Sequence, residues 1–190
     1  MPLVAPDQIE TPRLLLRLLQ EADLPSLLEM NSDPEVTALL PYATWNSIAD
    51  GKAWHDRMRG IEATGLALQF VVVSKSTNTA IGTCLLFRFE EASARVEVGY
   101  ALGRKYWGQG LMRAALVALL GRAFASMQLR RVEAEVNTRN PASAALLARL
   151  GFTKEGLLRK RWVTKGQAED VEVYGLLQGE LRSEPVSRVV

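Results

Sequence analysis

The alternation of apolar and polar positions divides the chain into short β-rich runs and longer segments with a helical period. Runs rich in β-branched and aromatic residues, bounded by turn residues, are typical of strands. Such runs occur at residues 13–19, 66–74, 80–89, 95–102, 131–136, 156–163 and 170–177. Short turns join the runs between residues 66 and 102, which predicts an antiparallel meander.

Apolar residues at spacings of three and four predict helices. They occur at residues 21–30, 47–63, 111–127 and 141–150. Pro141 at a first helical position and Gly151 after the last one are typical helix boundaries. Residues 31–44 are expected to form a loop, residues 1–12 a loose arm and 183–190 a frayed tail. The order β-α-α-β-β-β-α-β-α-β-β predicts a mixed α/β layer fold.

Composition indicates one domain, residues 1–190, with flexible ends at 1–8 and 183–190. Apolar residues make up 48% and charged residues 23%, which is ordinary for a globular protein. The formal net charge is +2, so no bulk charge favours nucleic acid or a membrane surface. One Cys and one His are too few for a zinc site. No apolar span or signal segment is recognisable, so we expect a cytoplasmic, metal-free protein.

The segment at residues 104–116, RKYWGQGLMRAAL, carries the strongest chemical signal. Gly108 and Gly110 let the backbone approach a ligand closely, and the following helix points its free N–H groups at the turn. This arrangement predicts a phosphate cradle, although a purely structural turn is the alternative. A Rossmann motif is disfavoured because Arg113 stands where a third glycine is needed. No P-loop pattern occurs in the chain.

The stretch at residues 106–112, YWGQGLM, resembles the acetyl-coenzyme A motif of the GNAT N-acetyltransferases, in the ribosomal-protein N-terminal (RimJ/RimL-like) branch. Further segments resemble the same branch over roughly residues 8–179: ETPRLLLR at 10–17, SDPEV at 32–36, EVGY at 97–100, NPAS at 140–143, LGF at 150–152 and EG at 155–156. Two positions depart from the pattern. Lys105 replaces a usual Gln or Arg, and Arg113 replaces a frequent acidic residue.

The resemblance implies a GNAT-like fold: a mostly antiparallel, splayed mixed sheet of about seven strands flanked by four helices. It also implies acetyl-CoA as co-substrate, without a metal. Backbone N–H groups at 107–112 would hold the pyrophosphate, and residues 100–102 would run along the pantetheine and thioester. The expected coenzyme-binding residues are Tyr100, Ala101, Leu102, Lys105, Trp107, Gly108, Gln109, Gly110, Leu111, Met112, Asn140 and Ser143.

The resemblance implies direct attack of an amine on the thioester, which needs a base, an oxyanion donor and a proton for the thiolate. Glu97 is the first candidate base; the alternative is an exposed carboxylate paired with Arg95 or Arg131. Glu135, on the next strand, is the second candidate. Ser143 could meet the thiolate sulfur or simply face solvent. We expect Asn140 to cap its helix and to contact the pantetheine.

Other residues have both a structural and a chemical interpretation. Tyr174 could donate a proton but is more typical of a core. His55 fits a solvated surface position better than a general base. Trp45 and Trp54 could line the acceptor site or only pack. The lone Cys84, in an apolar run, is expected in the core, and the basic run at 159–161 is either a solvated face or a binding patch.

The expected function is transfer of acetyl from acetyl-CoA to a primary amine, and the resemblance favours a protein N-terminal α-amine. A small amine, such as a polyamine, amino acid or antibiotic, is the main alternative. Peptides would need a long groove between the loop at 31–45 and the final hairpin, whereas a small amine would need a closed, acidic pocket. A non-catalytic acyl-CoA-binding module and a homodimer both remain open.

Overall fold

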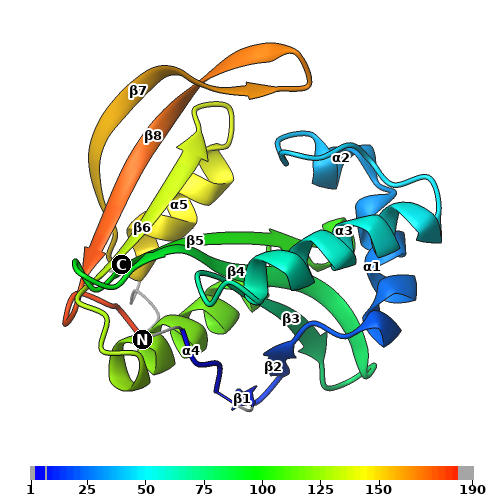
Figure 1. Cartoon of the computed structure of the whole chain (residues 1–190), viewed down its shortest axis with the longest axis horizontal. Coiled ribbons are helices and arrows are strands. Elements are labelled where there is room, and N and C mark those ends of the chain that lie inside the picture. Colours follow the sequence, from blue (N-terminus) through cyan, green and yellow to red (C-terminus); the bar gives the residue numbers. More distant parts are fainter. Residues whose placement is uncertain (1–2, 7, 184–190) are drawn as a thin grey trace, which may run out of the picture.

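The computed structural model describes residues 3–6 and 8–183. Its strands form an eight-stranded sheet in the order β1-β2-β3-β4-β5-β6-β8-β7 (Figure 1). The strands are β1 (Ile9–Glu10), β2 (Leu14–Leu18), β3 (Leu68–Ser74), β4 (Thr79–Glu90), β5 (Arg95–Leu102), β6 (Arg131–Asn137), β7 (Thr153–Thr164) and β8 (Gln167–Leu177). All neighbouring strands are antiparallel except β5 and β6, which are parallel.

The helices agree closely with the periodicity of the sequence. They are α1 (Leu24–Asn31), α2 (Pro34–Thr37), α3 (Ile48–Glu62), α4 (Leu111–Ser126) and α5 (Pro141–Leu150), with short 3₁₀ turns at Glu21–Asp23 and Arg104–Tyr106. Ser47 caps α3 through a capping box with Asp50. Gly151 ends α5 in the left-handed conformation, as its position in the sequence predicts.

Side chains of β3 alternate between two hydrophobic cores on opposite faces of the sheet. Phe70 and Val72 pack into the larger core, with α4 and α5. Val71 and Val73 pack into the smaller one, with α1, Trp45 and Trp54. This period of two is what a strand buried on both faces requires, and it fixes the register of β3 within the sheet.

The sheet opens between its two parallel strands. β5 and β6 pair only from Arg95↔Arg131 to Glu97↔Glu133. Beyond these pairs β5 continues to Leu102 beside β4, whereas β6 continues beside β8. Figure 1 shows β6, β8 and β7 turning away from β5. One edge of β5 from Val98 onward therefore has no strand partner on the β6 side.

The expected splayed mixed sheet is confirmed, with differences in detail. The sheet has one more strand than expected because β1 forms within the arm at residues 1–12. The arm is not loose where it is described: Leu3 is 7% exposed, and its N–H donates to Gly65 O at 3.0 Å. The loop at 31–44 contains α2, which begins at a proline with Asp33 as its N-cap. Residues 1, 2, 7 and 184–190 lie outside the described residues.

Candidate active site

The turn between β5 and α4 is shaped by two glycines. Gly108 and Gly110 have φ values of +72° and +71°, and a Cβ at either position would meet no atom within 4 Å. The first intrahelical bond of α4 runs from Ala114 N–H to Gly110 O, at 3.0 Å. The N–H groups of Leu111 and Met112 therefore have no acceptor within the helix. This concave turn at the positive end of a helix fits a phosphate group.

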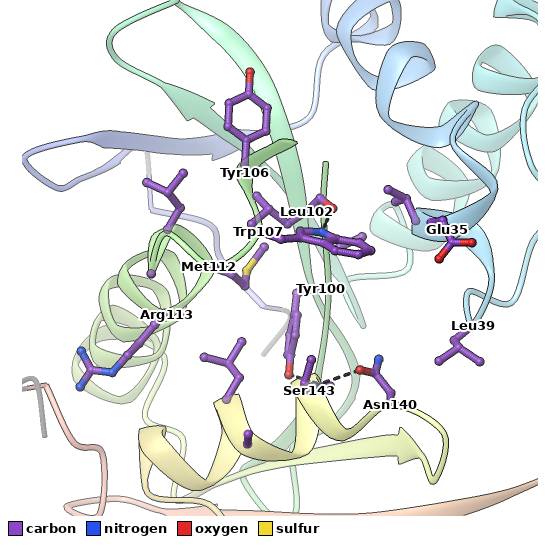
Figure 2. Close-up of a pocket in the computed structure, with 18 of the residues that line it drawn as sticks. Glu35, Leu39, Tyr100, Leu102, Tyr106, Trp107, Met112, Arg113, Asn140 and Ser143 are labelled. Carbon is purple, nitrogen blue, oxygen red and sulfur yellow. Dashed lines mark hydrogen bonds between the residues drawn. The ribbon is translucent and has the colours of Figure 1, made fainter. Parts of the chain in front are cut away.

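A cavity of about 570 Å³ lies in front of this turn. Figure 2 shows its walls: Met112 and Arg113 from α4, Asn140 and Ser143 from α5, and Glu35 and Leu39 from the α2 region. The Trp107 indole lies at the end of β5, where its Nε1 donates to Leu102 O at 2.7 Å.

All but two of the twelve expected coenzyme-binding residues line this cavity. The exceptions are Lys105 and Gln109. The Lys105 ammonium forms an ion pair of 2.6 Å with Glu29 in α1, and Gln109 Nε2 donates to Lys105 O at 2.9 Å. Both side chains are exposed, and their partners in these two interactions, Glu29 and Lys105 O, lie outside the cavity.

Asn140 and Ser143 are positioned by the first turn of α5. The Ser143 N–H donates to Asn140 Oδ1 at 3.0 Å, which confirms the expected N-cap. The hydroxyls of Ser143 and Tyr100 are 2.6 Å apart, so this bond joins α5 to β5 across the opening in the sheet (Figure 2). Burial raises the pKa of Tyr100, so its hydroxyl keeps its proton at neutral pH and can donate.

A second cavity, a groove of about 740 Å³, meets the first. Its walls come from the segment at 39–42, from α3, from β4, β5 and β6, and from the end of β7. Six residues line both cavities: Leu39, Leu40, Tyr100, Ala101, Asn140 and Ser143. A group bound in one cavity can therefore react with a group bound in the other only near Ala101 and Ser143.

Glu97 lies on the floor of the groove and is 7% exposed. Its Oε2 accepts a hydrogen bond of 2.7 Å from Arg88 Nη1, not from Arg95 or Arg131. Arg95 and Arg131 instead both contact Glu133. Burial raises the pKa of Glu97, and the Arg88 guanidinium opposes that rise. The alternative interpretation of Glu97, an exposed carboxylate paired with Arg95 or Arg131, is thus wrong, and a buried carboxylate with a raised pKa fits a general base.

Glu135 is held by more donors than Glu97. Trp162 Nε1 donates to its Oε2 at 2.7 Å, and Arg161 Nη2 donates to its Oε1 at 3.3 Å. Arg88 Nη1 lies 3.7 Å from the same Oε1. These bonds attach β7 to β6, so the contacts of Glu135 are those of a structural anchor.

The comparisons with known proteins agree with this geometry. A family model described as an acetyltransferase (GNAT) domain matches residues 13–153. An uncharacterized N-acetyltransferase, p20, of Bacillus licheniformis is 34% identical over 92% of this chain and 98% of the relative. The chain belongs to the GNAT acetyltransferase family.

Solved GNAT structures share the fold over almost the whole chain. Ribosomal-protein-S5-alanine acetyltransferase from Vibrio fischeri is 26% identical, with a TM-score of 0.76 over 92% of this chain and 98% of that chain. Spermidine N-acetyltransferase from Vibrio cholerae, in complex with CoA and spermine, is 20% identical, with a TM-score of 0.76 over 90% and 98%. The chain is therefore an acetyl-CoA-dependent N-acetyltransferase.

Three residues with a candidate role in this GNAT domain are structural. Tyr174 is 5% exposed and donates to Glu172 at 2.6 Å, as expected of a core tyrosine. Cys84 is fully buried, and burial raises the pKa of its thiol to about 12, so it cannot supply a thiolate. Trp45 packs in the smaller core, with its ring centroid 5.5 Å from that of Trp54. Trp54 packs there too but also lines the groove.

The remaining candidates divide between surface and groove. The His55 side chain is only 14% exposed, so the expectation of a solvated histidine is wrong, yet His55 lines neither cavity. Arg159 and Lys160 are exposed on β7, whereas Arg161 reaches into the groove.

The sequence reasoning missed Arg88. It lies at a break in the pairing of β4 with β5 and has a φ of +54°. No motif marks this position; only the alternation of β4, interrupted near residue 88, could have suggested a bulge.

None of the helices within the described residues is long and apolar enough to span a membrane.

Proposed function

We propose that this enzyme acetylates the N-terminal α-amine of a protein or peptide by direct attack on acetyl-CoA. The observation that carries the proposal is the groove of about 740 Å³ between the segment at 39–42 and the β7–β8 hairpin. This is the position in which a peptide acceptor would need a groove, and it meets the other cavity at Ala101 and Ser143. The named activity of the Vibrio fischeri relative supports the same acceptor class.

The first cavity fits coenzyme A. The N–H groups of Leu111 and Met112 would bind the pyrophosphate, and Arg149, which lines the same cavity, would add positive charge for phosphate groups. The free edge of β5 from Val98 onward would pair with the amides of pantetheine, as an added strand does. Asn140 and Ser143 face this edge from α5.

Bound acetyl-CoA supplies the thioester carbonyl that the amine attacks. In our proposal a backbone N–H on the free edge of β5 donates to the developing oxyanion. Ser143 donates to the departing thiolate, with the Tyr100 hydroxyl behind it at 2.6 Å. The Ser143 oxygen thereby accepts a hydrogen bond from Tyr100 while its own O–H donates to the sulfur.

Glu97 would accept a proton from the acceptor's ammonium group, which leaves the neutral amine that attacks the thioester. Glu97 and Ala101 lie on the same face of β5, and residues four apart on a strand are separated by about 13 Å. The carboxylate therefore acts through water in the groove rather than by direct contact. Gly99, between them on the same face, has no side chain to block this line.

The test is release of coenzyme A thiol from acetyl-CoA with two sets of acceptors. One set is short peptides with varied N-terminal residues, each paired with its N-terminally blocked form. The other set is small amines: polyamines, amino acids and aminoglycosides. We expect turnover with free peptides and none with blocked ones. Turnover with small amines alone would contradict the proposal while leaving the acetyltransfer chemistry intact.

A further inference from the structure

The groove is lined by more positively charged side chains than negatively charged ones. Five charged side chains line it: Arg57 from α3, Arg88 from β4, Arg161 from β7, Glu97 from β5 and Glu135 from β6. Arg88 and Arg161 are engaged with the two carboxylates, at 2.7 Å for Arg88–Glu97 and 3.3 Å for Arg161–Glu135. No carboxylate of the described residues is therefore left over for a ligand cation on these walls.

Arg57 is the guanidinium that remains. Its side chain is exposed, and it forms no ion pair with a carboxylate in the part of the chain that the structure describes. It lies three residues after Trp54 on α3, so both project from one face of the helix. Its positive charge is felt at the Tyr42 hydroxyl, where it opposes the rise in pKa that burial causes. Arg57 lines the same groove as Tyr42 and Trp54.

A polyamine is a poor fit to these walls. Each of its ammonium groups would lose water against a surface whose carboxylates are already paired, and would face an unpaired guanidinium. A carboxylate near Arg57 would instead gain a partner for the water that it loses, because the planar guanidinium binds carboxylate with two parallel hydrogen bonds. The apolar wall of Tyr42, Trp54 and Met58 beside it would accommodate the aliphatic part of such an acceptor.

We propose that Arg57 is a specificity-determining residue that binds a side-chain carboxylate of the acceptor, so that the enzyme prefers N-termini with Asp or Glu close to the amine. This inference rests on the proposed function and narrows its substrate class. An acidic acceptor also agrees with Lys165, which follows the groove residue Thr164 in the chain and whose ammonium donates to Thr37 O at 2.7 Å.

The experiment compares peptides that differ only in charge. Peptides with a free N-terminal alanine carry Glu, Gln or Lys at position two, three or four, and spermidine is assayed alongside. For the best position we expect kcat/KM to be about fivefold higher with Glu than with Gln, as for a partly exposed charge pair. The difference is expected in KM, and it should shrink at high salt because the pair is solvent-accessible.

The matched variants are Arg57→Gln and Arg59→Gln. Both arginines are exposed on α3, but Arg59 does not line the groove. We expect Arg57→Gln to lower kcat/KM for the Glu peptide to about that for the Gln peptide, which abolishes the preference. Arg59→Gln should retain the preference, and Arg57→Glu should shift it toward the Lys peptide. Coenzyme A binding by each variant reports whether the fold is intact.

The outcomes separate this inference from the proposed function. Equal turnover of Glu and Gln peptides, or a preference that survives Arg57→Gln, would overturn the role of Arg57 while leaving peptide acetylation in place. Acetylation of spermidine in preference to every peptide would overturn both.

Discussion

Glu97 and Glu135 lie on neighbouring strands and both approach Arg88, but their surroundings differ. Glu135 accepts hydrogen bonds from Trp162 and Arg161, whereas Glu97 is bonded only by Arg88 among these groove residues. A base must be free to exchange its proton with the acceptor. The contacts therefore favour Glu97 as the base and assign Glu135 to the support of β7.

The first prediction separates these two carboxylates. We expect Glu97→Gln to lower kcat about 100-fold or more, because a positioned base contributes about that much. Glu135→Gln should lower it far less. Burial raises the pKa of Glu97, so this residue favours folding most below its unfolded pKa, and that contribution is lost as the pH rises through its folded value. At pH 8, Glu97→Gln should consequently not lower the melting temperature. A larger loss of kcat in Glu135→Gln would reverse the assignment.

The second prediction concerns the pH profile and Arg88. The Arg88 guanidinium lowers the pKa of Glu97, while burial and the negative charges of Glu135 and Glu133 raise it. Replacing Arg88 with Gln removes the opposing cation, so the pKa of Glu97 rises further. We expect the acidic limb of kcat/KM to move to higher pH in Arg88→Gln and to stay near the wild-type position in Arg88→Lys. If the acidic limb of kcat/KM stays at the same pH in Arg88→Gln, then that limb does not arise from ionisation of Glu97.

At the scale of elements, α5 carries the two side chains that face the free edge of β5. Its start is fixed by Asn140 and its end by Gly151, with a φ of +102°. A Cβ at Gly151 would lie 2.3 Å from the backbone oxygen of Glu180. The glycine is thus required both by its dihedral angle and by the chain segment that passes over the end of α5.

The third prediction uses a second left-handed glycine as a control. Gly166, in the β7–β8 turn, has a φ of +79° and open space around a Cβ. Gly166→Ala should cost only the left-handed strain, about 1–2 kcal/mol. Gly151→Ala adds a clash with backbone, so its melting temperature should fall further, by at least about 4 °C more than that of Gly166→Ala. Equal losses would show that the segment at 180 moves aside freely. Thermal unfolding measures both.

At the scale of the whole molecule, a hydrogen bond connects the β7–β8 hairpin to the opposite side of the acceptor groove. Lys165, at the tip of the β7–β8 hairpin, donates to Thr37 O in α2, 128 residues away in sequence. Most contacts along the hairpin are between its own two strands, and β8 attaches it to β6. The tip therefore depends on this bond for its position over the groove.

The fourth prediction tests this connection. Lys165 and Lys160 have φ values of 51° and 50°, so both already carry the strain of the left-handed region, and alanine, which keeps the Cβ, leaves it unchanged at either position. We expect Lys165→Ala to speed amide hydrogen exchange at the hairpin tip and to raise KM for peptides several-fold, with coenzyme A binding unchanged. Lys160→Ala should do neither. A rise in KM of the same size in both variants would attribute the effect to loss of positive charge rather than to the hydrogen bond.

Much of the fold could be predicted from local pattern. The period of two in 66–74 and the period of three and four in 111–127 reflect burial on faces that each element defines by itself. The two-residue β1 and the four-residue α2 were missed because such short elements have no measurable period. The burial of Glu97 could not be predicted because alternation along β5 says which face a residue occupies, not whether another element covers that face.

The sequence by itself determined the elements, the glycine turn before α4 and the chemistry of that turn, because dihedral freedom and helix-end N–H groups are local properties. Only the tertiary structure decided where β5 and β6 part, which residues line both cavities, and that Arg88 rather than Arg95 or Arg131 holds Glu97. These features depend on pairings between segments far apart in the chain. Their free energies depend on packing and desolvation in the assembled fold, and no local pattern encodes them.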